Sequence, residues 1–140
     1  MAHAESRGDS VIFRQIDEIR AGRKTQTRRI RKPGHGSSGR AEGTELTITE
    51  AAGHSVGKSY AIVPKRGHKA IPDGRIRITR IRCERVQDIS EADARAEGVE
   101  SVAAYRALWD SINGKTKGAR WQDNPFVWVY EFVFEPTEAA

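Results

Sequence analysis

FVWVYEFVF, residues 126 to 134, is the stretch that decides the fold. Aromatic side chains occupy every second position from Phe126 to Phe134, and three of the four residues between them are valines. Because successive side chains of a strand point to opposite faces, this segment would carry apolar groups on both of its faces. A strand of that kind is buried on both sides, which predicts a central or barrel-closing strand.

Two shorter strands are predicted upstream of it. ELTIT (45–49) alternates between polar and apolar residues, and we expect Leu46 and Ile48 to face inward. SYAIVP (59–64) is the second candidate, and it ends at Pro64, which cannot donate to a sheet ladder.

RIRITRIRCERV (75–86) predicts a long strand whose alternation changes partway. Its first two isoleucines share one parity, whereas Ile81 and Cys83 share the other. A β-bulge near Thr79 would restore a single apolar face along the whole strand.

Short helices are predicted around these strands. Ile16 and Ile19 recur at helical spacing before Gly22, a natural residue for ending a helix. Ser90 and Ser101 each begin a further helix as its N-terminal cap. Several strands with two or three short helices predict a small, barrel-like α+β domain.

The domain boundaries follow from composition. Residues 1–9 and 136–140 are expected to be flexible tails around a single domain, residues 10–135. Two polar segments, residues 33–43 and 65–74, are expected to be loops, the first of them rich in glycine and serine.

Basic residues are concentrated in two segments of a chain whose net charge is +5 and whose pI is about 9.7. Residues 20–41 hold eight basic residues and no acid, and residues 57–85 hold nine against two acids. Crowded like charges repel each other unless an anion lies between them. The pattern therefore favours RNA as a partner, with DNA not excluded; the alternative is two solvated loops that never meet.

The sequence predicts neither a membrane segment nor a bound cofactor. It lacks an apolar run near the ~20 residues that span a bilayer and a signal-peptide core at its N-terminus, so we expect a cytoplasmic protein. Cys83 is the only cysteine, so an internal disulfide is impossible. The four histidines lack metal-ligand spacing, so no metal site is expected.

Two glycine-rich stretches resemble phosphate-binding motifs without their context. GHGSSG (34–39) matches a dinucleotide fingerprint but follows no predicted strand and precedes no predicted helix. GHSVGKS (53–59) is one residue short of a P-loop. Among the tryptophans, Trp109 and Trp128 fit core patterns, whereas Trp121 lies in a polar segment and is the candidate for stacking a base.

GRKTQTRRI (22–30) combines a lysine with two threonines directly after the first predicted helix. A neutral lysine amine can take the proton of a threonine hydroxyl, whose oxygen then attacks an acyl carbon. That chemistry requires a lowered lysine pKa, which neighbouring arginines and burial both favour. The alternative from the residues alone is a basic turn that holds phosphate.

Four segments together resemble the ASCH domains, relatives of the PUA RNA-binding fold, and most closely those of phages and bacteria. They are GRKTQTRRI (22–30), VQDISEADARAEGV (86–99), YRALWDSIN (105–113) and NPFVWVYEF (124–132). The resemblance implies a small PUA-like β-barrel with short helices at its rim. It also implies a basic cleft suited to RNA or to a modified nucleoside.

Some small bacterial ASCH proteins deacylate N4-acetylcytidine with residues of a GRKTxTxR stretch. By this resemblance Thr27 would be the nucleophile, Lys24 its activator and Glu97 the acid/base or orienting carboxylate. Further ligand contacts are expected from Arg23, Arg28, Arg29, Lys65, Arg66 and Trp121. The alternatives are an RNA-binding module without catalysis, or a ribonuclease in which Lys24, Arg28 and Arg29 stabilise charge on a cleaved phosphate.

Overall fold

The computed structural model describes residues 10–13, 15–42 and 45–137. The expected N-terminal tail, residues 1–9, lies outside the described residues, as does the end of the expected C-terminal tail from residue 138. The boundaries of the 10–135 domain therefore stay a prediction.

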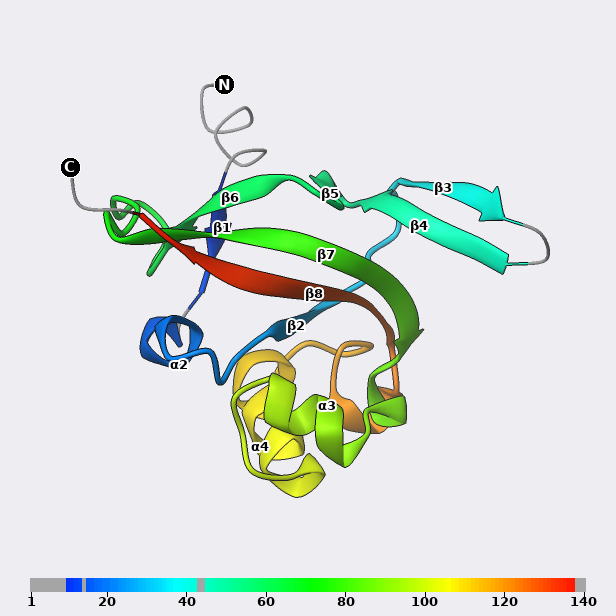
Figure 1. Cartoon of the computed structure of the whole chain (residues 1–140). Helices are drawn as coiled ribbons and strands as arrows, with labels where there is room; N and C mark the ends of the chain where they lie inside the picture. Colours follow the sequence, from blue (N-terminus) through cyan, green and yellow to red (C-terminus); the bar gives the residue numbers. More distant parts are fainter. Residues whose placement is uncertain (1–9, 14, 43–44, 138–140) are drawn as a thin grey trace.

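The described chain forms eight strands, three α-helices and two short 3-10 helices (Figure 1). In chain order they are β1 (Ser10–Ile12), α2 (Ile16–Arg20), β2 (Gln26–Ile30), β3 (Ser37–Glu42), β4 (Glu45–Ala51), β5 (His54–Ser55), β6 (Ser59–Val63), β7 (Gly74–Arg85), η1 (Val86–Asp88), α3 (Glu91–Ala96), α4 (Val102–Asn113), η2 (Trp121–Asp123) and β8 (Phe126–Pro136).

All eight strands belong to one sheet with β7 and β8 as its longest members. β8 pairs antiparallel with β2 on one side and with β7 on the other. β7 continues to β6 and, at one register position, to β4, while β1 joins β6 in parallel and β3 and β5 join β4. The predicted central strand and the α+β class are confirmed.

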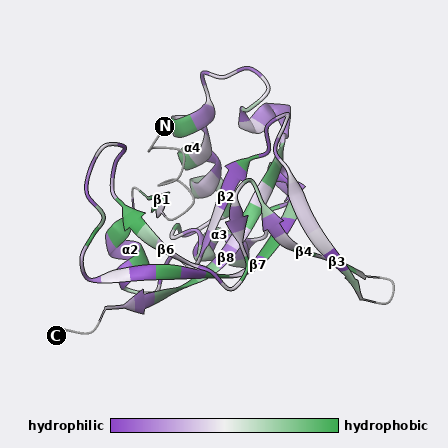
Figure 2. Cartoon of the chain, turned by 90° about the horizontal axis from the view of Figure 1, so that it is seen from above, coloured by the Kyte–Doolittle hydropathy of each residue, from purple (hydrophilic) through white to green (hydrophobic). Residues whose placement is uncertain are grey.

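β8 separates two hydrophobic cores, as its two apolar faces predict. Trp128, Tyr130 and Phe132 belong to the core beneath β1, β6 and β7. Val127 and Val129, both fully buried, belong to the core formed with α3 and α4. Figure 2, coloured by hydropathy, shows hydrophobic and hydrophilic residues interspersed within the strands. Both faces of this strand are held by packing, so its position is well fixed.

The predicted β-bulge is confirmed at Thr79. The pairing of β7 with β8 shifts register between Ile78 and Arg80, which leaves Thr79 exposed. Ile76, Ile78 and Ile81 are all buried as a result, at 1%, 2% and 4% exposure. One inserted residue thus keeps the isoleucines on one face across a change of parity.

The helix boundaries are confirmed by their caps. α2 is followed by Gly22, whose φ of 76° suits glycine. The Ser90 hydroxyl accepts a hydrogen bond from the Asp93 N–H at 3.0 Å at the start of α3, and Ser101 does the same for Ala104 at the start of α4. Both helices lie at one end of the sheet, beside β2 (Figure 1).

The β3–β4 hairpin corrects two expectations. Residues 33–43 were expected to form a loop, yet β3 occupies Ser37–Glu42 as an edge strand. Leu46 was expected to face inward, yet it is 75% exposed, whereas Ile48 packs against the core. The hairpin extends away from the rest of the sheet (Figure 1), and β4 meets β7 only at Ile48. Alternation predicts a face but does not reveal that a strand end lies beyond the core.

The expected loop at 65–74 is present up to Asp73, after which Gly74 begins β7. Two further findings concern membrane segments and metal sites. No helix among the described residues has the length and apolar character needed to cross a membrane. Within the same part of the chain, no group of three or more His, Cys, Asp or Glu side chains could hold a metal ion.

Candidate functional site

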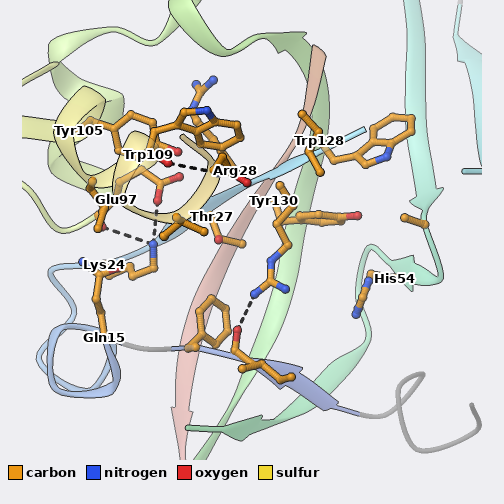
Figure 3. A pocket seen from close by; sticks show the side chains of 18 of the residues that line it. Gln15, Lys24, Thr27, Arg28, His54, Glu97, Tyr105, Trp109, Trp128 and Tyr130 are labelled. Carbon is orange, nitrogen blue, oxygen red and sulfur yellow. Dashed lines mark hydrogen bonds and ion pairs between the residues drawn. The ribbon is translucent and has the colours of Figure 1, made fainter. Parts of the chain in front are cut away.

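A pocket of about 490 Å³ opens between β2 and α4 and reaches in to the sheet. Lys24, Thr27 and Glu97 all line it, as do Arg28 and Arg29. Figure 3 shows Lys24, Thr27 and Glu97 side by side, near Tyr105 and Trp109 of α4. A pocket of this size is typical of sites for small molecules.

Lys24 and Glu97 form a buried ion pair at the inner end of this pocket. The Lys24 Nζ lies 2.8 Å from the Glu97 Oε1, and both side chains are only 3% exposed. The same ammonium donates to the carbonyl oxygen of Gln26 at 2.9 Å. Backbone pairing brings the two residues together, since they form an isolated β-bridge and the Thr25 N–H donates to the Ala96 carbonyl at 2.7 Å.

Burial shifts both members of this pair toward their neutral forms. It lowers the pKa of Lys24 from its usual value, and the Glu97 carboxylate opposes that change. It raises the pKa of Glu97, and the Lys24 ammonium opposes that change in turn. The Glu97 Oε2 is buried and has no hydrogen-bond partner among the described residues. For each side chain, desolvation therefore opposes the charged form and the charge of the partner supports it.

Thr27 reaches the pocket because β2 alternates. Thr27 pairs with Tyr130 of β8 in register, and its neighbours Gln26 and Arg28 point to the opposite face of the strand. Thr27 is 9% exposed and lines the pocket, so it has little contact with bulk water. The structure thus brings together Lys24, Thr27 and Glu97, as predicted.

Arg29, two residues further along β2, carries a second positive charge into the pocket. Its Nη2 donates to the Ile12 carbonyl at 2.6 Å, and its guanidinium lies 5.3 Å from the Phe13 ring centroid. Burial lowers its pKa, although an arginine remains protonated under ordinary conditions. Arg29 is therefore positioned to attract an oxygen of a ligand.

Arg28 borders the pocket, but its guanidinium is bound elsewhere. Its Nη2 lies 2.7 Å from the Glu84 Oε2 and 3.1 Å from the Asp93 Oδ2, and its side chain is 0% exposed. Its Nε donates to the Gln26 Oε1 at 3.1 Å. These bonds tie β2 to β7 and α3, which makes Arg28 a structural anchor more than a ligand contact.

Arg82 extends this anchor into a network of ion pairs. It contacts Glu84 at 2.6 Å, Glu131 at 2.9 Å and Asp93 at 3.4 Å. Asp93 lies in α3, the helix that ends next to Glu97. The network therefore fixes α3 against the sheet and, with it, the position of Glu97.

The other predicted ligand contacts lie outside the pocket. Arg23 is 63% exposed and pairs with Glu18 at 2.7 Å. Lys65 and Arg66 are exposed in the loop before β7 and do not line the pocket. The structure does not place these three side chains in the pocket.

Trp121, the residue predicted to stack a base, does not line the pocket. Trp121 is only 8% exposed and packs with its ring centroid 6.4 Å from that of Tyr105. Its backbone N–H donates to the Asp110 side chain at 2.9 Å, which ties η2 to α4. The polar residues around it in sequence concealed this packing. Trp109 and Trp128 are buried, as their patterns predict.

The expected repulsion between basic segments is relieved in part by acids. Ion pairs join Arg20 to Asp73, Arg28 to Asp93, Arg77 to Glu135 and Arg82 to Glu131. Most of these acids come from the later part of the chain, where acids outnumber bases. Net charge is therefore weaker support for a polyanionic partner than the sequence suggested.

Sequence reasoning missed His54 as a pocket residue. Its ring lies 5.0 Å from that of Tyr60 and 5.6 Å from that of Tyr130, and its Nε2 is buried without a hydrogen-bond partner among the described residues. Burial, followed by the charge of Arg29, lowers its pKa, so the imidazole is neutral near pH 7. A lone histidine without motif spacing gave no signal for this placement.

The chain is a small α+β domain, and two solved structures share its fold. One is the ASCH domain from Lactobacillus crispatus, with a TM-score of 0.55, 18% identity, and 86% of this chain and 70% of that chain covered. The other is a protein from Enterococcus faecalis described as DUF984, with a TM-score of 0.54, 15% identity, and 89% and 72% covered. No protein-family model and no curated protein sequence matches the chain. At these identities the likeness establishes the fold, which is that of the ASCH domain.

Proposed function

We propose that this protein binds a nucleobase derivative in the pocket between β2 and α4 and hydrolyses N4-acylated cytidine. The observation that carries the proposal is the convergence of the Lys24–Glu97 pair with Thr27 in one pocket. Nucleophile, proton acceptor and proton donor are the three groups that an amide hydrolysis of this type needs.

The first half of the reaction transfers the acyl group to Thr27. The Lys24 amine takes the proton of the Thr27 hydroxyl while Oγ1 attacks the acyl carbon. When the carbon–nitrogen bond breaks, the protonated Glu97 carboxyl gives its proton to the departing N4 amine. Cytidine leaves, and the acyl group remains as an ester on Thr27.

The second half regenerates the site with water. The Glu97 carboxylate takes a proton from the water that attacks the ester carbon, and the Lys24 ammonium gives its proton to the Thr27 Oγ1 as the carboxylic acid departs. These transfers restore the neutral Lys24 amine and the protonated Glu97 carboxyl with which the cycle began. The neutral forms that this cycle uses are the ones that burial favours for both side chains.

Arg29 completes the proposed site by stabilising negative charge. During acyl transfer the carbonyl oxygen of the acyl group becomes negatively charged, and a fixed guanidinium in a pocket with little water stabilises it strongly. The hydrogen bond from Arg29 to the Ile12 carbonyl restricts the guanidinium before substrate arrives.

The ribonuclease alternative has less support in the structure. It assigns Arg28 to a cleaved phosphate, but two carboxylates already hold that guanidinium. A binding module without catalysis would not need a lysine and a glutamate buried together beside a cavity, since an ion pair of this kind costs desolvation energy.

Chromatography of N4-acetylcytidine incubated with the protein tests the proposal. We expect cytidine to appear with the wild type and not with Thr27→Ala. Absence of product, or equal product from both proteins, would eliminate the hydrolase. Shortened fragments from an RNA substrate would support the ribonuclease instead, and salt-sensitive RNA binding without any product would support the binding module.

A further inference from the structure

The outer end of the pocket is formed by a turn that the proposed chemistry does not use. Lys32 and His35 both line the cavity from the segment Lys32–Pro33–Gly34–His35. The His35 N–H donates to the Lys32 carbonyl at 3.1 Å, and Gly34 has a φ of 88°. Proline followed by a glycine with positive φ is typical of a type II turn, so this turn is rigid by local geometry.

Two hydrogen bonds fix the orientation of the His35 ring. Its Nδ1 accepts from the Lys32 backbone N–H at 3.2 Å and from the Trp128 Nε1–H at 3.1 Å. Because Nδ1 accepts both bonds, the proton of the neutral imidazole lies on Nε2. The ring therefore offers an N–H donor whose direction is fixed by Trp128, a residue of the central strand.

Arg31 adds a second cation next to the same tryptophan. Its guanidinium lies 5.1 Å from the Trp128 ring centroid. Trp128 is itself only 2% exposed, so both His35 and Arg31 contact a buried side chain. We name Arg31, Lys32 and His35 the rim cluster.

The charges that line the cavity leave an excess of positive charge near this cluster. Among the described residues that line it, Glu97 is the only acid, and it pairs with Lys24. Arg28 is neutralised by Glu84 and Asp93 outside the cavity. Once these paired charges are discounted, Arg29 and Lys32 are the cations of the cavity lining that have no carboxylate in the cavity. An anionic ligand is the natural complement of such a site.

The distance between Thr27 in β2 and Lys32 beyond the end of that strand indicates where the anion would lie. Thr27 and Lys32 are five positions apart, so their backbones are separated by up to roughly 16 Å of extended chain. A free nucleoside with its acyl group at Thr27 would leave the Lys32 end of the cavity without a partner.

From these observations we infer that the rim cluster binds the phosphate of a nucleotide whose base enters the pocket. The inference rests on the proposed function for the position of the base, and it changes the substrate class from a free nucleoside to a phosphate-bearing cytidine. The same phosphate chemistry is offered by a free nucleotide and by an RNA strand.

Direct binding measurements test this inference without depending on catalysis. Titration calorimetry would compare cytidine, cytidine 5′-monophosphate and a short cytidine-containing RNA on the wild type, Lys32→Ala and Lys69→Ala. Lys69 is an exposed lysine of the loop before β7 and does not line the cavity, so it is the charge-matched control. We expect the monophosphate to bind the wild type about tenfold more tightly than cytidine, since bonds to charged groups are worth this much or more.

Lys32→Ala should reduce the ratio of monophosphate affinity to cytidine affinity toward one. Lys69→Ala should retain the wild-type ratio, and Lys32→Arg should restore much of it. His35→Ala should also reduce it, with thermal unfolding used to confirm that the variant is folded. Tighter binding of the RNA than of the monophosphate would identify a strand as the source of the phosphate, and the reverse order a free nucleotide.

Equal binding of cytidine and its monophosphate, including no measurable binding of either, would overturn the inference. Equal losses in Lys32→Ala and Lys69→Ala would do the same, because they would indicate an unlocalised charge effect. Hydrolysis of N4-acetylcytidine without a phosphate preference would refute the rim cluster alone. A Lys32-dependent preference without hydrolysis would refute the proposed hydrolase alone.

Discussion

Two buried cations, one in β2 and one just before it, have different surroundings. On one side Arg28 is held by two carboxylates, Glu84 and Asp93, within the network that fixes α3. Two residues before β2 begins, Lys24 has a single carboxylate, Glu97, and the pair faces a cavity. A cation with two acids serves to anchor, whereas a cation with one acid beside a cavity can exchange a proton with its partner and a ligand. The comparison separates the structural charges of this domain from the chemical ones.

Removing Lys24 is expected to have the largest effect. Lys24→Met should abolish hydrolysis and destabilise the fold by about 3–5 kcal/mol at neutral pH, because the Glu97 charge would be left buried without its partner. Urea denaturation measures the free energy of unfolding. The Lys24→Met/Glu97→Gln double variant should recover much of the stability and none of the activity.

The pH dependence of the stability of Lys24→Met provides a control for this prediction. Burial raises the folded pKa of Glu97 above its ordinary 4.5, so the stability linked to this group is fully present below that pH and lost as pH rises through the folded value. The deficit of Lys24→Met should therefore grow with increasing pH. A deficit that does not depend on pH would show that Glu97 carries no buried charge.

The pH profile of kcat/KM tests whether the pair works as a unit. Activity needs one proton shared by Lys24 and Glu97, so it should fall when the pair gains a second proton or loses the first. The acidic limb should lie above 4.5 and the alkaline limb below 10.5, because burial shifts the two pKa values in those directions. Limbs at or outside the ordinary values would argue against desolvated partners.

Replacing Arg28 is expected to have an intermediate effect, on stability more than on activity. Arg28→Met should cost roughly 1.5–3 kcal/mol of stability, because Glu84 and Asp93 are partly exposed and Arg82 still contacts both. The folded variant should hydrolyse N4-acetylcytidine far better than Lys24→Met does. Thermal unfolding and initial rates measure the two quantities. If activity fell as far as in Lys24→Met, the division between anchoring and chemistry would be wrong.

The smallest effect is expected outside both regions, on the β3–β4 hairpin. Leu46→Thr should change the free energy of unfolding by less than about 0.5 kcal/mol, because the side chain is 75% exposed. Ile48→Thr, on the same strand but packed against the core, should cost clearly more. Chemical denaturation of both variants checks this, and equal costs would contradict the observed exposure.

Features that depend on local periodicity were predictable from the sequence. The two apolar faces of β8, the bulge at Thr79 and the caps at Ser90 and Ser101 follow from alternation and capping chemistry. Each requires only a few neighbouring residues, and each agrees with the structure.

Features that depend on packing between distant segments were not predictable in the same way. Lys24 and Glu97 are 73 positions apart, and their meeting was inferred only through a family resemblance. Polar neighbours concealed the burial of Trp121, and a glycine-rich composition concealed β3. In each case the tertiary partner, which composition does not reveal, determines the outcome.

Steady-state hydrolysis of N4-acetylcytidine by wild type, Thr27→Ser and Thr27→Ala tests the central claim most directly. The account predicts that Thr27→Ala loses activity by roughly 10³-fold or more with unchanged stability, because the nucleophile is gone, while Thr27→Ser, which keeps the hydroxyl, retains a measurable part. Turnover by a folded Thr27→Ala protein at the wild-type rate would contradict it.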